Sequence, residues 1–393
     1  MIKLVKSTFY QEAKTKIALI NFIRRAWQLS FGLESKKFED NFSHYQARKY
    51  GIFLNSGSSA NLAIIQALLN LGKIKKGDMV GFSALTWSTN VMPLIELGLK
   101  VLPIDVELDT LNVSSKKLLD CLKKYPIEMF FLTNLLGFCG DIDKIAKICR
   151  QKKIILVEDN CESLGTIYQG RKLGNFGLAS TFSFFVGHHL STIEGGMVCT
   201  DDRELATMLK IVRAHGWDRN LEKAEQEKLK NKFKIESSFY DHYTFYDLGF
   251  NLRPTEIQGF LGNQQLQYVQ EIIRKRNHNF LQLAKVIYKK IDKYYPINFS
   301  HIDFVSNFAF PVICRSKKIR NALIEKCGGR IEIRPIVGGD MTQQPFFRKY
   351  SQKFGHLSDK SNVSIIHQQG LYFGNNPELT KKEIKTIIDI FAS

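Results

Sequence analysis

Two adjacent histidines, His188 and His189, follow an apolar run and a glycine near the middle of the chain. The run, residues 181–186, is typical of a strand, and Gly195-Gly196 opens a second short strand after the histidines. Because side chains alternate between the faces of a strand, both imidazoles cannot point into the core, so we expect one to face a cleft. An imidazole there could transfer protons near neutral pH. A histidine among apolar residues is also commonly a satisfied core group, and this pattern alone leaves both interpretations open.

A second candidate site is the polar turn Asn55-Ser-Gly-Ser-Ser-Ala60, between a predicted strand at residues 50–54 and an apolar helix at 61–70. The start of a helix presents backbone amides without intrahelical partners, and such amides can hold a phosphate. Gly57 would allow a ligand to approach the backbone closely. A serine N-cap without any ligand accounts for the same turn equally well.

Trp87 and Asp159 each stand where a predicted strand ends. Ligands of parallel sheets gather beyond the carboxyl ends of the strands. Trp87 could stack there on a ligand ring, although tryptophan more often fills a core. Asp159 ends a very apolar strand, and a carboxylate buried alone is costly, so we expect it to have a partner.

The elements that would position these residues are continuous apolar strands separated by helical patterns. The predicted strands lie at residues 50–54, 79–83, 101–105, 129–133 and 154–158. Strands of this kind indicate an α/β fold with a mostly parallel sheet covered by helices on both faces. The polar stretch 221–239 has few apolar residues, and we expect it to be a mobile excursion.

We divide the chain into a large α/β domain (1–254), a bridging helical region (255–295) and a small C-terminal α+β domain (296–393). The small domain has predicted strands at residues 308–313, 330–334 and 371–373. Its last helix places isoleucines on one face, and Thr380 with Glu383 forms a possible capping box at its start.

Composition bounds the class of protein. The 393 residues are 44% hydrophobic and 24% charged, which is ordinary for a globular chain of two or three domains. We expect no membrane association, because no run approaches the ~18 apolar residues of a membrane helix and the first residues lack a signal-peptide region. The seven cysteines show no Cys-x-x-Cys pair or metal spacing, which favours free thiols, a cytoplasmic location and no metal.

The formal net charge of +18 raises nucleic acid as a possible partner. The basic residues are scattered in short groups, and no helix-turn-helix or aromatic-interleaved basic patch accompanies them. We therefore expect no nucleic-acid partner. A solvated surface that attracts anionic small molecules explains the charge better.

Six motifs occur in one order along the chain: Ser56-Gly-Ser-Ser-Ala-Asn61, Trp87, Glu158-Asp159, Phe182-Ser-Phe184, Glu194-Gly-Gly196 and Gly249-Phe-Asn-Leu-Arg-Pro-Thr-Glu256. Together they resemble the sugar aminotransferase (DegT-like) family of fold-type I pyridoxal phosphate (PLP) enzymes. The resemblance runs from about residue 31 to the C-terminus. It implies a PLP-dependent transferase fold with a large and a small domain.

The resemblance also implies how the cofactor phosphate is held. The backbone amides of Gly57 and Ser58 and the hydroxyl of Ser183 would bind it within one subunit. Asn251 would reach the phosphate of the neighbouring subunit, which implies a homodimer with a shared active site.

Around the ring, the resemblance implies that Trp87 stacks on the pyridine and that Asp159 pairs with the pyridine nitrogen. The charge of Asp159 would keep that nitrogen protonated, so that the ring can accept electrons. Glu162 would also lie at the cofactor, where the aminotransferases usually have glutamine.

The main departure from the family is at His188. Counting back from Glu194-Gly-Gly196, the family's Schiff-base lysine falls on this residue, and an imidazole has no primary amine. PLP or its amine form, pyridoxamine phosphate (PMP), would therefore be bound noncovalently. The histidine resembles the subgroup of GDP-4-keto-6-deoxymannose 3-dehydratase type. A related subgroup carries an iron–sulfur cluster, which the lack of a cysteine cluster argues against here.

The implied reaction removes the C3 hydroxyl of a nucleotide-linked 4-keto-6-deoxysugar and gives a 4-keto-3,6-dideoxysugar, with L-glutamate as amino donor. His188 would be the base, titrating near its ordinary ~6.5 without a large shift. His189 is the alternative candidate, but the spacing favours His188, and His189 would have a structural or supporting role. Arg219 and Arg334 would bind the sugar diphosphate. The alternatives are a nucleotide-sugar aminotransferase with an unusual base and a noncatalytic PLP-binding regulatory protein.

Overall fold

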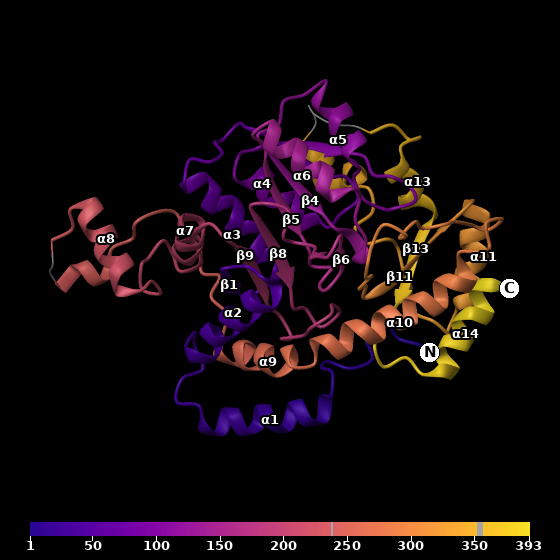
Figure 1. Cartoon of the computed structure of the whole chain (residues 1–393), viewed down its shortest axis with the longest axis horizontal. Helices are drawn as coiled ribbons and strands as arrows, with labels where there is room; N and C mark the ends of the chain where they lie inside the picture. The colour runs from indigo at the N-terminus through magenta and orange to yellow at the C-terminus, as the bar shows by residue number, and fades with distance from the viewer. Residues whose placement is uncertain (237–238, 352–356) are drawn as a thin grey trace.

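The computed structural model describes residues 1–236, 239–351 and 357–393. Within these ranges a large sheet and a smaller sheet lie in two bodies that the long helices α9 (Glu256–Leu266) and α10 (Val269–Ile287) connect (Figure 1). Thr255 and Gln258 form a capping box at the start of α9. The range 255–295, predicted to be helical, contains these two helices, but it ends in the short strand Tyr294–Tyr295.

The large sheet has seven strands in the order β1-β9-β8-β5-β4-β2-β3 in the described residues. Only β9 runs against its neighbours there; the other pairs, from β8 through β3, are parallel. The mostly parallel sheet predicted from the sequence is confirmed. The strands are β1 (Tyr50–Leu54), β2 (Met79–Ser83), β3 (Lys100–Ile104), β4 (Met129–Thr133), β5 (Ile155–Asp159), β8 (Ala179–Ser183) and β9 (Gly196–Thr200).

Helices cover both faces of this sheet, and strand β4 shows why its sequence is continuously apolar. Met129 and Phe131 pack in the core beneath α3 (Gly57–Asn70), α4 (Met92–Glu96) and α7 (Arg203–Arg213). Phe130 and Leu132 pack on the opposite face with α5 (Ser115–Leu122) and α6 (Ile142–Gln151). Because successive side chains point to opposite faces, a strand between two helical layers needs apolar residues at every position.

The small body is built on an antiparallel sheet in the order β10-β11-β13-β12. The capping box of Thr380 and Glu383 is confirmed at the start of its last helix. The N-terminal segment joins this body, since Ile2 pairs with Ile331. The division at residues 254 and 295 stays a prediction. The elements are β10 (Tyr294–Tyr295), β11 (Ala309–Cys314), α11 (Lys317–Cys327), β12 (Ile333–Arg334), α12 (Pro345–Tyr350), α13 (Asn362–Gln369), β13 (Gly370–Gly374) and α14 (Lys381–Ala392).

The polar stretch 221–239 contains the helix α8 (Lys223–Phe233), which the sequence analysis did not predict, and its expected mobility stays a prediction. Its lysines, glutamates and glutamines are good helix formers, and none of its side chains is buried. Figure 1 shows α8 projecting from the large body. Residues 237–238 of the stretch lie outside the described residues.

None of the helices in the described residues combines the length and apolar character needed to cross a membrane. The seven cysteines, all in the described ranges, are free thiols. The remaining elements are α1 (Glu12–Arg25), α2 (Leu33–Gln46), β6 (Ile167–Tyr168), β7 (Arg171–Lys172) and the 3₁₀ turns Ser88–Asn90, Leu135–Gly137, Phe239–Tyr243 and Met341–Gln343.

Candidate active site

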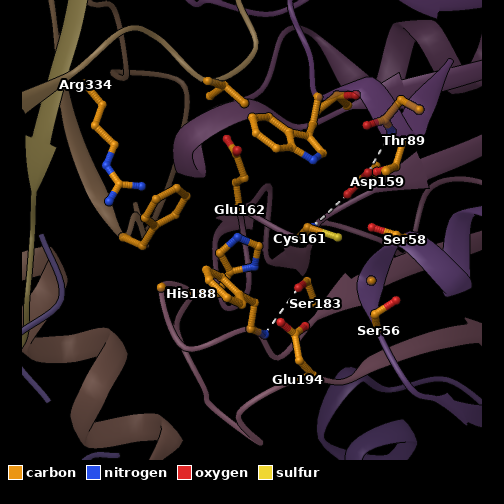
Figure 2. Close-up of a pocket in the computed structure, with 18 of the residues that line it drawn as sticks. Ser56, Ser58, Thr89, Asp159, Cys161, Glu162, Ser183, His188, Glu194 and Arg334 are labelled. Atoms are coloured by element: carbon orange, nitrogen blue, oxygen red, sulfur yellow. Dashed lines mark hydrogen bonds between the residues drawn. The ribbon is translucent and has the colours of Figure 1, made fainter. Parts of the chain in front are cut away.

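A cavity of about 320 Å³ opens beyond the carboxyl ends of β2, β4 and β5, where it meets the small body. Figure 2 shows Ser56 and Ser58 on one side of this space and Arg334 on the other, with Glu162 and His188 between them. The cavity brings together eight predicted site residues: Gly57, Ser58, Trp87, Asp159, Glu162, Ser183, His188 and Arg334.

The start of α3 lies directly against strand β8. The Ser56 hydroxyl accepts a hydrogen bond from the amide of Ser59 at 3.0 Å, so the N-cap is present. A Cβ atom on Gly57 would lie 2.6 Å from Cβ of Ser183, which is why this position is a glycine. The close approach places the Ser183 hydroxyl beside the first amides of the helix, where an anion is favoured. The capped helix and the anion site are thus compatible.

Asp159, at the end of β5, is only 4% exposed and is held by amide donors. Its Oδ2 accepts hydrogen bonds from Nδ2 of Asn61 at 3.0 Å and of Asn90 at 2.6 Å. Its Oδ1 accepts one from the Cys161 amide at 2.9 Å. Asp159 therefore has partners, as expected, and they are neutral amide groups. Asn61 ends the first motif noted in the sequence, whereas Asn90 lies three residues after Trp87 and was not singled out; only their positions around Asp159 give them a role.

His188 lies in the loop between β8 and β9, and its ring lines the cavity. The ring centroid is 5.2 Å from that of Phe308, and Nδ1 is buried without a hydrogen-bond partner in the described chain. Burial lowers the pKa of His188 to about 4, while the carboxylate of Asp159 opposes this change. The expectation of a pKa near the ordinary value was wrong, because it ignored desolvation. At neutral pH the imidazole is therefore uncharged and can accept a proton.

His189 lies behind the cavity wall and is 4% exposed. Neither of its ring nitrogens has a hydrogen-bond partner among the described residues. Burial and the charge of Arg276 hold the pKa of His189 well below its usual value. Of the two adjacent imidazoles, one lines the main cavity and the other is a buried neutral ring, as expected. Both lie in the loop after β8, so the fold of this loop separates them and not the alternation of a strand.

Glu162 and Trp87 form part of the wall opposite the start of α3. Oε2 of Glu162 accepts a hydrogen bond from the Leu136 amide at 3.0 Å. Burial raises the pKa of Glu162 to about 8, so the side chain carries a proton through most of the neutral range. Trp87 remains 55% exposed although it lies in the cavity wall, which leaves its ring open to the space.

Arg334 enters the cavity from β12 of the small body. One of its guanidinium nitrogens, Nη2, lies 2.8 Å from Oε1 of Glu332 in an ion pair. The other carboxylate oxygen of Glu332 accepts a hydrogen bond from the amide of Leu4 at 2.9 Å. The N-terminal segment therefore supports the arginine, a connection that sequence reasoning missed because Leu4 lies 328 residues before Glu332 in the chain.

Two predicted site residues lie outside this cavity. Asn251 is exposed, and its Oδ1 accepts a hydrogen bond from Nε of Arg253 at 3.0 Å. Arg219 is exposed as well, with its guanidinium carbon 5.2 Å from the Trp217 ring centroid. Among the described residues, no group of three or more histidine, cysteine, aspartate and glutamate side chains could hold a metal ion.

The mostly parallel sheet, the cavity at the carboxyl ends of its strands and the separate antiparallel sheet define the fold of the PLP-dependent aminotransferases. A model of the DegT/DnrJ/EryC1/StrS aminotransferase family matches residues 10–392. The chain belongs to this family.

Its relatives include 3-dehydratases. The chain is 34% identical over 372 residues to a GDP-4-keto-6-deoxy-D-mannose 3-dehydratase of Yersinia pseudotuberculosis, which is 92% of this chain and 91% of the relative. The solved structure of the Escherichia coli enzyme with bound hydrated PLP has a TM-score of 0.88 and 31% identity, covering 100% of this chain and 99% of that one. A GDP-4-keto-6-deoxymannose-3-dehydratase with a trapped PLP-glutamate geminal diamine has a TM-score of 0.88, 30% identity and full coverage of both chains.

Proposed function

We propose that this protein is a PLP/PMP-dependent 3-dehydratase of a nucleotide-linked 4-keto-6-deoxysugar. The observation that carries the proposal is the uncharged imidazole of His188, which lines the same cavity as Asp159 and the start of α3. An imidazole can move protons but cannot attach the cofactor covalently. The family membership and the 34% identity to a GDP-4-keto-6-deoxy-D-mannose 3-dehydratase support this reaction and make that GDP-sugar the first substrate to test.

The residues of the cavity fit noncovalently bound PLP or PMP. The amides of Gly57 and Ser58, with the Ser183 hydroxyl, suit the phosphate because they lie at a helix N-terminus. The Asp159 carboxylate suits a protonated pyridine nitrogen, and the open face of Trp87 suits the ring. When bound, the cofactor supplies an amine for the C4 ketone of the sugar and an electron sink.

Glu162 completes the proposed cofactor-binding set. With its pKa raised to about 8 by burial, it presents a hydrogen-bond donor at neutral pH, at a position where the family's aminotransferases usually have the donor amide of glutamine. A neutral acid beside Asp159 avoids placing two like charges in one buried site.

In this mechanism His188 removes a proton from the cofactor methylene carbon and returns it to the departing C3 hydroxyl of the sugar. Burial favours the uncharged imidazole of His188, so its protonated form is more acidic than an ordinary imidazolium and readily gives up the proton. Asp159 would face the pyridine nitrogen, and Arg334 would bind the sugar diphosphate after leaving its contact with Glu332. The oxygen removed from the sugar is balanced by conversion of L-glutamate to 2-oxoglutarate and ammonia.

Mass analysis of the product tests the proposal. The protein would be incubated with PLP, L-glutamate and the 4-keto-6-deoxy forms of GDP-mannose, dTDP-glucose and CDP-glucose. The expected product has lost one oxygen and contains no amino group, with one 2-oxoglutarate formed per turnover. A stable aminosugar would instead establish an aminotransferase. Cofactor binding without turnover of any of these sugars would support a noncatalytic protein.

Two variants of His188 sharpen this test. His188→Asn removes the base and should reduce dehydration by at least about 100-fold while retaining cofactor absorbance. His188→Lys should create a covalent, borohydride-reducible link to the cofactor and lose dehydration. Undiminished dehydration in either variant would exclude His188 as the essential base.

We also propose that the active site is shared in a homodimer. Arg219 and Asn251 are exposed and lie outside their own subunit's cavity, as expected for residues that act across an interface. The exposed aromatic rings of Tyr243 and Phe245 lie beside Trp217, which precedes Arg219 by two residues. Burying these rings in an interface would be favourable.

Complementation between variants tests the shared site. Subunits carrying Arg219→Ala and subunits carrying His188→Asn would be inactive separately. In a mixed dimer, one site would receive an intact His188 from one chain and an intact Arg219 from the other, so activity should return. Failure to regain activity in a mixture proven to contain heterodimers would contradict a shared site.

A further inference from the structure

We infer that Arg276 is a positioning residue for His188: its guanidinium fixes the loop that carries the histidine to the small body. The inference rests on the proposed role of His188 as base. Nothing in the motifs of the sequence distinguishes Arg276, which lies within the helical run of α10.

The geometry of Arg276 joins three distant segments. Its Nη2 donates a hydrogen bond to the carbonyl oxygen of His188 at 3.2 Å. Its Nη1 donates to the carbonyl oxygens of Asn375 at 2.5 Å and Phe308 at 3.3 Å. Phe308 precedes β11 and Asn375 follows β13, so one planar group ties the loop after β8 to both central strands of the small sheet. Arginine suits this task because its donors are fixed in a fork.

The same contacts constrain the position of the imidazole itself. The ring of Phe308, whose carbonyl Arg276 binds, lies 5.2 Å from the His188 ring between centroids, tilted by 35°. His188 is therefore held through its backbone by Arg276 and packed on its ring by a residue that Arg276 also holds. A shift of the guanidinium would move both supports together.

The charge of Arg276 is unusual because it is buried without a carboxylate. The side chain is 5% exposed, and no ion pair to it is found within the described chain. Burial lowers the pKa of Arg276 to about 9, which still leaves it a cation at neutral pH. A buried cation without a carboxylate is costly in a core, and here the carbonyl oxygens of the three segments that it joins accept its hydrogen bonds.

Several groups act on the titration of His188. Burial is the largest influence and lowers its pKa, Asp159 and the backbone of Ser183 raise it, and Arg276 adds a smaller lowering effect. Glu162 and Glu194 line the same cavity. Burial, which the position of the loop determines, therefore keeps the imidazole uncharged although a carboxylate is nearby.

Asn279 provides a matched control one turn along α10. It is also 5% exposed, and its Nδ2 donates to the carbonyl oxygen of Asn376 at 3.0 Å. Asn279→Ala thus removes a buried contact from the same helix to the same segment without touching the His188 loop. A purely structural role for Arg276 predicts similar behaviour of the variants at both positions.

The first test is an NMR titration of the His188 imidazole in protein labelled at histidine, with the signal assigned by its loss in His188→Asn. In Arg276→Gln the loop loses this contact, so water should reach the imidazole and the midpoint should move upward toward its ordinary value. In Asn279→Ala, which leaves the contacts of the loop in place, it should stay within a few tenths of a unit. An unchanged midpoint in Arg276→Gln would overturn the positioning role. The NMR titration requires no turnover, so its result is independent of the proposed reaction.

The second test is steady-state kinetics of dehydration with the pH profile of each variant. Arg276→Lys loses the fork and should lower kcat about ten-fold or more with little change in KM. Arg276→Gln should show the same loss and an acid limb moved to higher pH. Full kcat in Arg276→Lys, or equal losses in Arg276→Gln and Asn279→Ala with one common profile, would overturn the positioning role. Absence of dehydration in the unmodified protein would instead refute the proposed function.

Discussion

Nδ2 of Asn90 lies 2.6 Å from Oδ2 of Asp159, and the amide of Asn61 donates to the same oxygen. The carboxylate is therefore fixed by donors from the segment after Trp87 and from helix α3. Side chains from two walls of the cavity therefore donate to the same oxygen atom of Asp159. The orientation of Asp159 follows from this arrangement and does not depend on a bound ligand.

The first prediction concerns Asp159→Asn. Either orientation of the new amide turns its NH₂ group toward existing donors, because Oδ2 accepts from Asn61 and Asn90 and Oδ1 accepts from the Cys161 amide. We expect destabilisation by about 1–3 kcal/mol, as for a buried unsatisfied donor, together with a loss of turnover. Thermal unfolding measures the first effect. Asp201→Asn, at a more exposed ion pair, is the control and should cost less than about 1 kcal/mol.

The second prediction is the position of the acid limb of kcat/KM. The base must be unprotonated, and burial lowers the pKa of His188 to about 4, so activity should persist down to about pH 4 and fall below it. A profile of initial rates over pH 3.5 to 8 measures this, with circular dichroism at each pH to confirm folding. A limb between about pH 6 and 7 would contradict the desolvated imidazole.

The third prediction concerns stability and Glu162. Its pKa is raised from 4.5 when unfolded to about 8 when folded, so the folded state binds the extra proton between these values. Stability from this group is present below the lower value and is lost as pH rises through the higher one. Glu162→Gln should therefore raise the melting temperature at pH 8.5 more than at pH 5. A difference that is the same at both pH values would show that Glu162 is not buried as a neutral acid.

The fourth prediction concerns Gly57→Ala. The new methyl group would come within 2.6 Å of Cβ of Ser183, so α3 and β8 must separate at the site proposed for the phosphate. We expect cofactor affinity to fall about 100-fold or more, measured by fluorescence titration. Gly328→Ala is the control, since its new methyl group meets only the Glu325 carbonyl oxygen, at 3.1 Å. Unchanged affinity in Gly57→Ala would place the phosphate elsewhere.

Much of the large sheet could be predicted from the sequence because a doubly covered strand must be apolar at every position. Strands β1, β2 and β4 have the predicted bounds, and β3 and β5 are shifted by one residue. The segment around α8 was predicted less well. Its composition is too polar for a core. Good helix formers can still make an exposed helix, and such a helix has no apolar face that would indicate it in the sequence.

The sequence by itself determined the family-specific motifs, the histidine in the lysine position and the order of strands and helices, because these are properties of residue type and local spacing. Only the tertiary structure decided the electrostatics. Groups distant in the chain provide the amide partners of Asp159 and set the protonation of Glu162 and His188. The hydrogen bond from Arg276 to the carbonyl oxygen of His188 also joins distant segments. The physical reason is that desolvation and hydrogen bonding are set by what surrounds a group in space, which local patterns of residues do not encode.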